Sequence, residues 1–317
     1  MRILIVKTSS LGDVIHNLPV VGDIQQHFPQ AIIDWCVEES FAAIPRLHPG
    51  VNEVIPVALR RWKKNLLSMK TWREIQAFRQ KIAHHTYDIV LDTQGLLKSA
   101  LLAGRAQGIK CGYAADSARE PIAARYYDRT YSVSKSAHAV SRNRLLAAAA
   151  LGYTPDPAIN FGIFSPSTVM NWLPETPFVV LLSATSRDDK LWPEAHWIAL
   201  GQQLKALGYS AILPGGSALE RERATRLAAT IPDAIAAPPM SIPELATLLA
   251  QAKAVVGVDT GLSHLAVALN TPTVAIYTAT DPGLTGVYGS GYYKNLGGKA
   301  QTPDVQSVLD ALQPVLG

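Results

Sequence analysis

The sequence predicts an α/β fold with two parallel sheets, each covered by helices. Three observations support this. Short apolar segments alternate with helical patterns along the chain, as in proteins whose parallel strands are joined by right-handed helical crossovers. A Pro-rich segment without helical period separates two similar halves. Hydrophobic residues make up 48% of the 317 residues and charged residues 17%, which is typical of a globular chain with a full core.

The expected strands are short, apolar and β-branched, as in parallel sheets buried on both faces. They cover residues 3–8, 33–37, 54–57, 89–92 and 112–114 in the first half, and 178–183, 210–213, 254–258 and 273–277 in the second. Helical patterns fall between them, at 13–27, 70–84, 96–106, 138–151, 194–207, 218–229, 242–251 and 262–269. The helix after Ser241 begins with a capping box, because Glu244 follows three residues later.

The Pro-rich segment around residues 153–173 predicts an interdomain linker. We expect a first domain over 1–160, a linker over 161–173 and a second domain over 174–317. Ligands of such sheets bind at the carboxyl ends of the strands, so a cleft between the two halves is the expected site.

Charge is distributed unevenly. Residues 1–160 contain 20 Lys and Arg against 13 Asp and Glu, whereas residues 161–317 contain 9 against 12. The first half is therefore expected to bind a polyanionic partner. No apolar stretch approaches the roughly 20 residues of a membrane span, and no signal-peptide pattern begins the chain, which favours a cytoplasmic protein. The isolated Cys36 and Cys111 indicate buried residues in a reducing compartment.

Polar and small residues concentrate at four expected strand ends, at 7–13, 91–95, 183–193 and 258–264. In the last, V-D-T-G-L-S-H, Gly261 permits close backbone approach, and the helix that follows offers N–H donors to a phosphate or diphosphate. Asp259 beside it is suited to a sugar hydroxyl. The alternative is a helix with an Asp cap and a buried His264.

In S-A-T-S-R-D-D-K, the hydroxyls of Thr185 and Ser186 and the ammonium of Lys190 are suited to neutralising a leaving diphosphate without a metal ion. The adjacent Asp188 and Asp189 are more typical of a solvated loop than of a metal site.

The densest basic run is A-L-R-R-W-K-K, residues 58–64. It is either a solvated loop or a surface for nucleic acid, anionic lipid or a phosphorylated acceptor, and no RRM, KH or zinc-finger pattern favours nucleic acid. The absence of G-x-x-x-x-G-K-[ST] and of G-x-G-x-x-G after the first strand argues against a P-loop protein and a nicotinamide oxidoreductase.

The stretch K-T-S-S-L-G-D-V-I-H places Asp13 where the first strand gives way to a helix. Such a junction usually favours an anion as ligand. A carboxylate there is either a helix cap or a catalytic group.

Together these stretches resemble the bacterial ADP-heptose lipopolysaccharide heptosyltransferases over nearly the whole chain. The resemblance is carried by I-V-K-T-S-S-L-G-D-V-I-H, V-I-P-V-A-L-R-R-W and L-D-T-Q-G-L-L-K-S-A in the first half, and by T-S-R-D-D-K-L-W-P, V-D-T-G-L-S-H and T-D-P-G-L in the second. The T-S-S-L-G-D and R-R-W stretches favour the type I members.

The resemblance implies a GT-B fold, in which two Rossmann-like domains face a cleft. It implies metal-independent, inverting transfer of L-glycero-D-manno-heptose from ADP-heptose to the first Kdo of Kdo2-lipid A, with no cofactor and no nucleic acid partner. Because the acceptor is a lipid, we expect a cytoplasmic protein associated peripherally with the inner membrane through the basic, Trp-bearing loops at 60–72.

The resemblance also assigns roles to residues. Asp13 would be the general base that takes the proton of the Kdo hydroxyl, and Lys190 would also be catalytic. The donor-binding residues would be Thr185, Ser186, Lys190, Glu220, Met240, Asp259, Thr260, Gly261, Leu262, Ser263 and His264. The acceptor-binding residues would be Ser10, Arg60, Arg61, Lys63, Lys64, Gln94, Lys98 and Arg119.

Two departures from the family pattern lie near the expected nucleotide pocket. Gly215–Gly216 stands where relatives commonly have Trp-Gly, and Thr278–Ala279 stands where they commonly have Gly-Pro. Three alternatives remain open. They are heptosyltransferase II, another GT-B nucleotide-sugar enzyme such as an epimerase, and a non-catalytic protein that binds the nucleotide sugar or lipid A.

Overall fold

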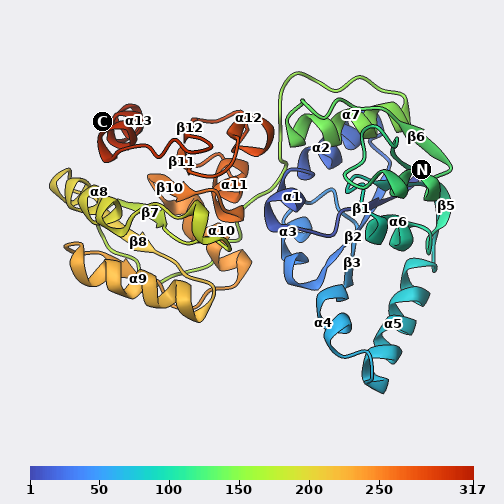
Figure 1. Ribbon diagram of the computed structural model, residues 1–317, viewed down its shortest axis with the longest axis horizontal. Coiled ribbons are helices and arrows are strands. Elements are labelled where there is room, and N and C mark those ends of the chain that lie inside the picture. Colours follow the sequence, from blue (N-terminus) through green and yellow to red (C-terminus); the bar gives the residue numbers. More distant parts are fainter. The chain divides into compact units, whose positions relative to one another are not determined.

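The computed structural model describes all 317 residues and contains two compact units, Met1–Ile163 and Phe164–Gly317 (Figure 1). The predicted linker, 161–173, straddles this boundary, and the chain from 152 to 177 has no helix or strand.

The sheet of the first unit has the order β3-β2-β1-β4-β5-β6, and all of its pairings are parallel. β1 and β4 are central neighbours, with Val6 opposite Asp92, so their loops leave the same edge of the sheet. The strands are β1 (Arg2–Val6), β2 (Ile32–Glu38), β3 (Glu53–Val57), β4 (Thr86–Asp92), β5 (Gln107–Tyr113) and β6 (Arg129–Tyr131).

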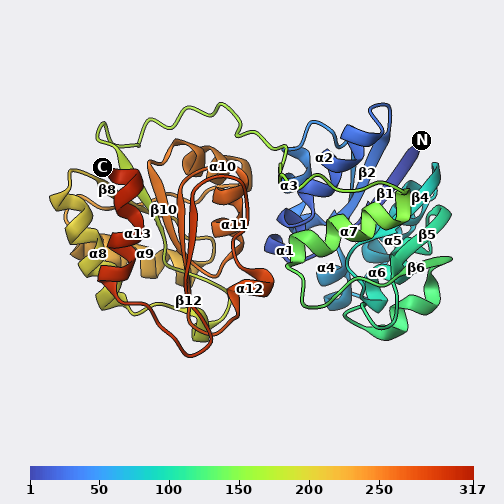
Figure 2. The ribbon, with the colours of Figure 1, turned by 90° about the horizontal axis from the view of Figure 1, so that it is seen from above.

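Helices cover both faces of this sheet (Figures 1 and 2). The helices are α1 (Leu11–Ile15), α2 (Leu18–His27), η1 (Glu39–Phe41), α3 (Ala43–Arg46), α4 (Leu59–Lys64), α5 (Met69–Ile82), α6 (Leu97–Ala103), η2 (Pro121–Tyr126) and α7 (Ala139–Leu151). Trp62 of α4 and Phe78 of α5 pack edge to face in a buried cluster with Leu4 and Val6 of β1. That packing holds the α4–α5 hairpin on the sheet.

The second unit repeats the architecture with the strand order β12-β11-β10-β7-β8-β9, again entirely parallel. The central strand β10 lies between β7 and β11, so three loops meet at its carboxyl end. The strands are β7 (Phe178–Leu182), β8 (Ser210–Leu213), β9 (Ile235–Ala236), β10 (Ala254–Val258), β11 (Thr273–Tyr277) and β12 (Tyr293–Gly297).

The helices of the second unit also lie on two faces. α8, α9 and α13 pack on one, where Trp197, Leu227 and Leu312 meet in one core cluster, and α10 and α11 cover the other (Figure 2). The helices are η3 (Asp188–Lys190), α8 (Glu194–Ala206), α9 (Ala218–Thr230), α10 (Ile242–Gln251), α11 (Gly261–Ala268), α12 (Pro282–Thr285) and α13 (Val305–Leu316).

The structure confirms the two parallel α/β sheets and corrects several elements. The predicted helix at 13–27 is two helices, since Pro19 in the first turn of α2 cannot donate the backbone bond that would continue α1. The predicted strand at 112–114 begins at Gln107. The strands β6, β9 and β12 were not predicted, because they are short or polar and show weak apolar alternation. The helices α4 and α13 were also missed, although α13 has a clear apolar face that buries Val308 and Leu312.

One buried ion pair joins α2 to α7 inside the first unit. Arg144 donates from Nε and Nη2 to the two carboxylate oxygens of Asp23, at 2.7 and 2.8 Å, and Nη2 also donates to the Asp156 carbonyl at 2.7 Å. Both side chains are less than a tenth exposed. Removing one partner would leave a charge that neither water nor protein neutralises.

We therefore expect Arg144→Met to destabilise the first unit by about 3–5 kcal/mol, measured as the free energy of unfolding in denaturant. Lys205→Met, which removes a cation from an exposed pair with Asp233, is the matched control and should change it by less than about 1 kcal/mol. Equal effects of the two substitutions would contradict the assignment of the Arg144 pair as structural.

Candidate functional site

The first-unit site starts from the loops that follow β1 and β4. The Gln94 side chain joins them. Its Oε1 accepts from the backbone N–H and hydroxyl of Thr8 at 2.6 and 2.8 Å and from Ser9 N–H at 3.3 Å, and its Nε2 donates to the Ser9 carbonyl at 2.7 Å. Gln94 is only 2% exposed. Both the oxygen and the nitrogen of this amide form hydrogen bonds within the protein. The predicted contact of Gln94 with the acceptor substrate stays a prediction.

Asp92, the last residue of β4, fixes the main chain of the loop that carries Gln94. Its carboxylate accepts from the backbone N–H groups of Gln94 and Gly95 at 2.8 and 3.3 Å and from the Tyr127 hydroxyl at 2.8 Å. The side chain is fully buried, and this burial raises the pKa of Asp92 despite those donors. The sequence alone gave no role to Asp92 or to Tyr127.

Asp13 is the third residue of α1 and closes a capping box with Ser10, the N-cap. Its Oδ2 accepts from Ser10 N–H and from Ser10 Oγ, both at 2.9 Å, and lies 3.6 Å from an Arg119 guanidinium nitrogen. Oδ1 takes part in none of these contacts. The two interpretations of Asp13 are therefore compatible, because one oxygen caps the helix and the other remains available to a ligand.

The charges around Asp13 favour its ionised form. Burial alone would raise the pKa of Asp13, but Lys7, Arg119 and the two hydrogen bonds from Ser10 together lower it below the ordinary value. Lys7 is buried and donates to the Thr93 carbonyl at 2.8 Å, and burial lowers the pKa of its ammonium to about 8. Lys7 was not predicted as a site residue, although it lies directly after β1 in the K-T-S-S stretch.

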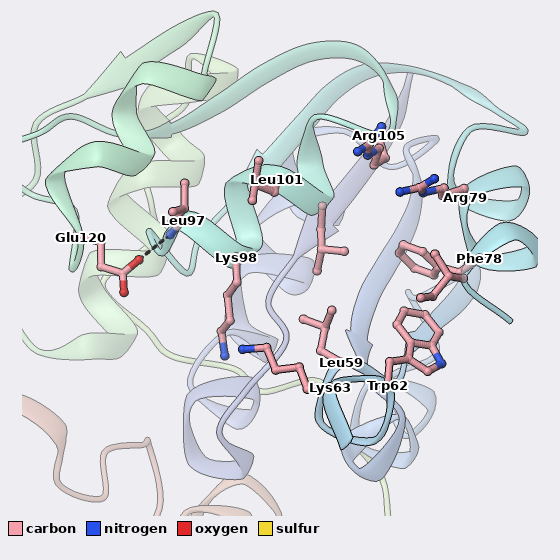
Figure 3. A pocket seen from close by; sticks show the side chains of 12 residues that line it. Leu59, Trp62, Lys63, Phe78, Arg79, Leu97, Lys98, Leu101, Arg105 and Glu120 are labelled. Atoms are coloured by element: carbon pink, nitrogen blue, oxygen red, sulfur yellow. Dashed lines mark hydrogen bonds between the residues drawn. The ribbon is translucent and has the colours of Figure 1, made fainter. Parts of the chain in front are cut away.

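A basic surface lies next to this site, on α4 and α6. The Lys98 ammonium donates to Ser9 Oγ at 3.0 Å, and burial together with the charges of Arg60 and Lys63 lowers the pKa of Lys98. In Figure 3 the amines of Lys63 and Lys98 point toward one another. They border a pocket of about 570 Å³ between α4, α5 and α6, which apolar side chains line together with Arg79, Arg105 and Glu120. The Glu120 carboxylate accepts from Leu97 N–H at 2.7 Å, so the cations outnumber the acids of the lining. A site with this composition is suited to an anionic amphiphile.

Two members of the basic run differ from expectation. The structure buries Trp62, whose Nε1 donates to Glu74 at 2.9 Å, so the aromatic ring belongs to the core and not to the basic surface. Arg61 is paired with Glu39 and Glu74 through three bonds of 2.7–3.0 Å. Arg60, Lys63 and Lys64 are exposed, and an ion pair with a carboxylate engages none of them.

The second-unit site is organised by Asp259, at the carboxyl end of β10. Its Oδ2 pairs with the Lys190 ammonium at 2.7 Å and accepts from Thr280 Oγ1 at 2.7 Å, and its backbone carbonyl accepts from Thr185 Oγ1 at 3.0 Å. The loops after β7, β10 and β11 thus converge on one residue. Thr280, which sequence analysis did not assign, stands in the quoted T-D-P-G-L stretch.

α11 begins beside this cluster, with Thr260 as its N-cap. The first N–H groups of a helix, here those of Gly261 and Leu262, have no partner within it and favour an anion. The Ser263 hydroxyl instead donates back to the Val258 carbonyl at 2.8 Å, inside the fold. Gly257 permits this close packing, because a Cβ there would lie 2.3 Å from Ser263 Oγ. His264 is buried, with Nε2 4.0 Å from Asp259 Oδ1.

The remaining predicted donor residues lie apart from this cluster or at its border. Glu220 caps α9, where its Oε2 accepts from the N–H groups of Gly216 and Ser217 at 2.9 and 2.8 Å. Ser186 is exposed in the loop after β7, and Met240 is half-buried just before α10. Asp189 pairs with Arg187, and no group of three or more His, Cys, Asp or Glu side chains is placed to hold a metal ion. The Lys190 ammonium beside Asp259 and the start of α11 are suited to a diphosphate, because both favour an anion.

Comparison with known proteins extends these observations. Residues 75–312 match the model of glycosyltransferase family 9 (heptosyltransferase). The chain is 47% identical over 291 residues to lipopolysaccharide heptosyltransferase 1 of Pseudomonas aeruginosa, covering 91% of this chain and 82% of that protein. It is also 47% identical over 296 residues to lipopolysaccharide heptosyltransferase 1 of Escherichia coli K12, covering 91% of each.

The fold matches a solved structure of E. coli heptosyltransferase WaaC with ADP. The TM-score is 0.91 at 42% sequence identity, and the match covers 99% of both chains. The two sheets described above therefore form a fold of the GT-B type.

We predict that Gln94→Leu, which keeps the volume of the side chain but removes its amide, exposes the loop after β1 to solvent. Thr8 N–H and Ser9 N–H would lose their acceptor, at about 1–3 kcal/mol for a buried group. Hydrogen exchange of residues 7–10 should quicken correspondingly.

Gln76→Leu, on the exposed surface of α5, provides the control and should leave this exchange unchanged. Exchange rates that are the same in Gln94→Leu and the parent would show that the loop does not depend on the amide.

Proposed function

Because the chain belongs to the heptosyltransferases of glycosyltransferase family 9, and is therefore a glycosyltransferase of lipopolysaccharide synthesis, we propose that it transfers L-glycero-D-manno-heptose from ADP-heptose to the first Kdo of Kdo2-lipid A. The family, predicted from the sequence, is confirmed. The proposed reaction inverts the anomeric centre and uses neither a metal ion nor a cofactor.

One observation supports the proposed chemistry most directly. The Asp13 carboxylate is kept ionised by Lys7 and Arg119, and only one of its oxygens is used as a cap. In the proposal, Oδ1 takes the proton of the Kdo hydroxyl while the hydroxyl oxygen bonds to the anomeric carbon. The bond from that carbon to the diphosphate oxygen breaks at the opposite face, and ADP leaves with its electron pair.

The donor groups of the proposal come from the second unit. The Lys190 ammonium and the N–H groups that begin α11 would neutralise charge that develops on the leaving diphosphate. Asp259, which holds Lys190 at 2.7 Å, would also accept from a heptose hydroxyl. A solved structure of E. coli WaaC holds ADP-2-deoxy-2-fluoro heptose, which agrees in class with this donor.

The acceptor groups of the proposal are exposed cations of the first unit. Lys63 and Lys98 line the pocket of Figure 3, and Arg60 and Lys64 belong to the same helix as Lys63. In the proposal these cations bind the carboxylates and phosphates of Kdo2-lipid A. None of the helices is long and apolar enough to span a bilayer. The proposal accordingly has the enzyme meet its lipid acceptor as a peripheral protein on the cytoplasmic face of the inner membrane.

We expect Asp13→Asn to lower the single-turnover rate by about 10²–10⁴-fold, because the amide cannot take the proton. The product would be followed by mass spectrometry after mixing protein, ADP-heptose and Kdo2-lipid A, with and without a chelator. Asp310→Asn, the same change on the exposed surface of α13, is the control. Addition of one heptose that survives the chelator and collapses only in Asp13→Asn would support the proposal.

Other outcomes of this experiment would contradict the proposed reaction and favour a different function. Transfer to a heptosylated acceptor but not to Kdo2-lipid A would favour heptosyltransferase II. Binding of ADP-heptose with no transfer to either acceptor would favour a binding protein. An unimpaired Asp13→Asn would leave Asp13 with its capping role alone.

The rate of the proposed reaction should depend on pH through the Asp13 carboxylate. The base must be ionised, so the rate falls as pH drops through the pKa of Asp13, which lies below the ordinary Asp value. Arg119→Gln removes one of the cations that lower the pKa of Asp13. In a plot of log kcat against pH, the acidic limb should therefore move to higher pH, by up to about one pH unit. Arg125→Gln removes an exposed charge nearby in the sequence and should not move that limb. A limb that stays in place in Arg119→Gln would show that Asp13 does not set it.

A further inference from the structure

The turn between α4 and α5 and the first turn of α5 expose four large apolar side chains within seven residues. Leu66 is 52% exposed, Leu67 101%, Met69 74% and Trp72 54%. Single exposed apolar residues are ordinary on a protein surface, but a contiguous group of this kind marks an interaction site. We name residues 65–72 the α4–α5 tip. In Figure 1 it lies at the far end of the two helices, away from the sheet of the first unit.

The tip has a defined conformation although its side chains face solvent. Asn65 N–H donates to the Trp62 carbonyl at 3.0 Å, and Ser68 N–H donates to the Asn65 carbonyl at 3.1 Å. The Trp72 indole donates to the Leu66 carbonyl at 2.8 Å, which ties α5 to the turn. Trp62 is buried at the base of the hairpin. The apolar side chains are therefore presented by a preorganised turn, which lowers the entropy lost on binding.

Cations surround the apolar group. Lys63, Lys64, Lys70 and Arg73 are exposed beside it. The one acidic residue of this stretch, Glu74, is occupied by Arg61 and by the Trp62 indole. Apolar side chains with a Trp, bordered by Lys and Arg whose long stems reach outward, match the boundary between acyl chains and anionic headgroups. The charge complementarity favours an anionic lipid bilayer over a protein partner.

We propose that the α4–α5 tip inserts Leu66, Leu67, Met69 and Trp72 into the headgroup–acyl boundary of an anionic bilayer, with the surrounding cations on the lipid headgroups. This inference deepens the proposed function, on which it rests for its biological setting, by identifying the segment that meets the membrane. α4 also carries Lys63, whose amine faces that of Lys98 in Figure 3. Insertion would thus bring the cations proposed for the acceptor to the depth of lipid phosphates.

The test is co-sedimentation of the full chain with vesicles of phosphatidylcholine, with and without phosphatidylglycerol, in the absence of donor and acceptor. Substituting Leu66, Leu67 and Met69 together by Ser should lower the partition onto the anionic vesicles by about tenfold or more. The control substitutes Val169 and Leu219 by Ser, which are 85% and 77% exposed and belong to the second unit, and should bind as the parent does.

The proposal is overturned if the parent does not bind anionic vesicles, if it binds neutral vesicles equally well, or if the triple variant binds as tightly as the parent. Transfer to deacylated acceptor in solution is measured in parallel and should be the same for the parent and the triple variant. A loss of that transfer in the triple variant would also overturn the proposal, since the tip would then act on the reaction itself. Failure of the proposed function would instead show as no transfer by the parent, with vesicle binding unaffected.

Discussion

The side-chain amide of Gln94 is the contact on which the first-unit site depends. β1 and β4 are neighbours in the sheet, and beyond their last residues the N–H groups of Thr8 and Ser9 donate to the Gln94 side chain, while the Thr8 carbonyl accepts from Glu38 N–H of β2 at 3.1 Å. One amide supplies an acceptor and a donor to that backbone, and Asp92 holds the amide's own main chain. Because α1 begins immediately after this loop, the position of Asp13 follows from a buried, uncharged group.

In the second unit, a charged side chain holds together the loops at the carboxyl ends of the strands. Asp259 stands at the end of the central strand β10, and it collects Lys190 from the loop after β7 and Thr280 from the loop after β11. A carboxylate suits this place because the ligand proposed there is an anion, which needs a mobile cation kept close by. The first unit, where the carboxylate of Asp13 is the proposed reactive group, surrounds it with Lys7 and Arg119.

The sequence predicted what depends on local pattern. Apolar period gave the parallel sheets, and glycine and polar residues at strand ends gave the Asp13 and Asp259 loops. It could not predict partners that are distant in the chain. Gln94 contacts residues 85 and 86 positions away, and Arg61 is neutralised by acids on two other segments. The pattern of basic letters in A-L-R-R-W-K-K likewise cannot distinguish the buried Trp62 from the exposed cations beside it.

The departures from the family pattern act on the support of the donor site and leave its proposed charged groups in place. Thr278, which departs from the pattern expected from the resemblance, donates from Oγ1 to the Asp189 carbonyl at 2.8 Å, and Asp189 immediately precedes Lys190. A glycine at this position would have no hydroxyl to donate, so the Asp189 carbonyl would lose this bond. At Gly215 a Cβ would lie 2.7 Å from Arg221 N, so a Trp there requires α9 to begin farther away. Thr278 and Gly215 thus contact the loop that carries Lys190 and the start of α9, and neither replaces a member of the Lys190–Asp259 pair that would meet the diphosphate.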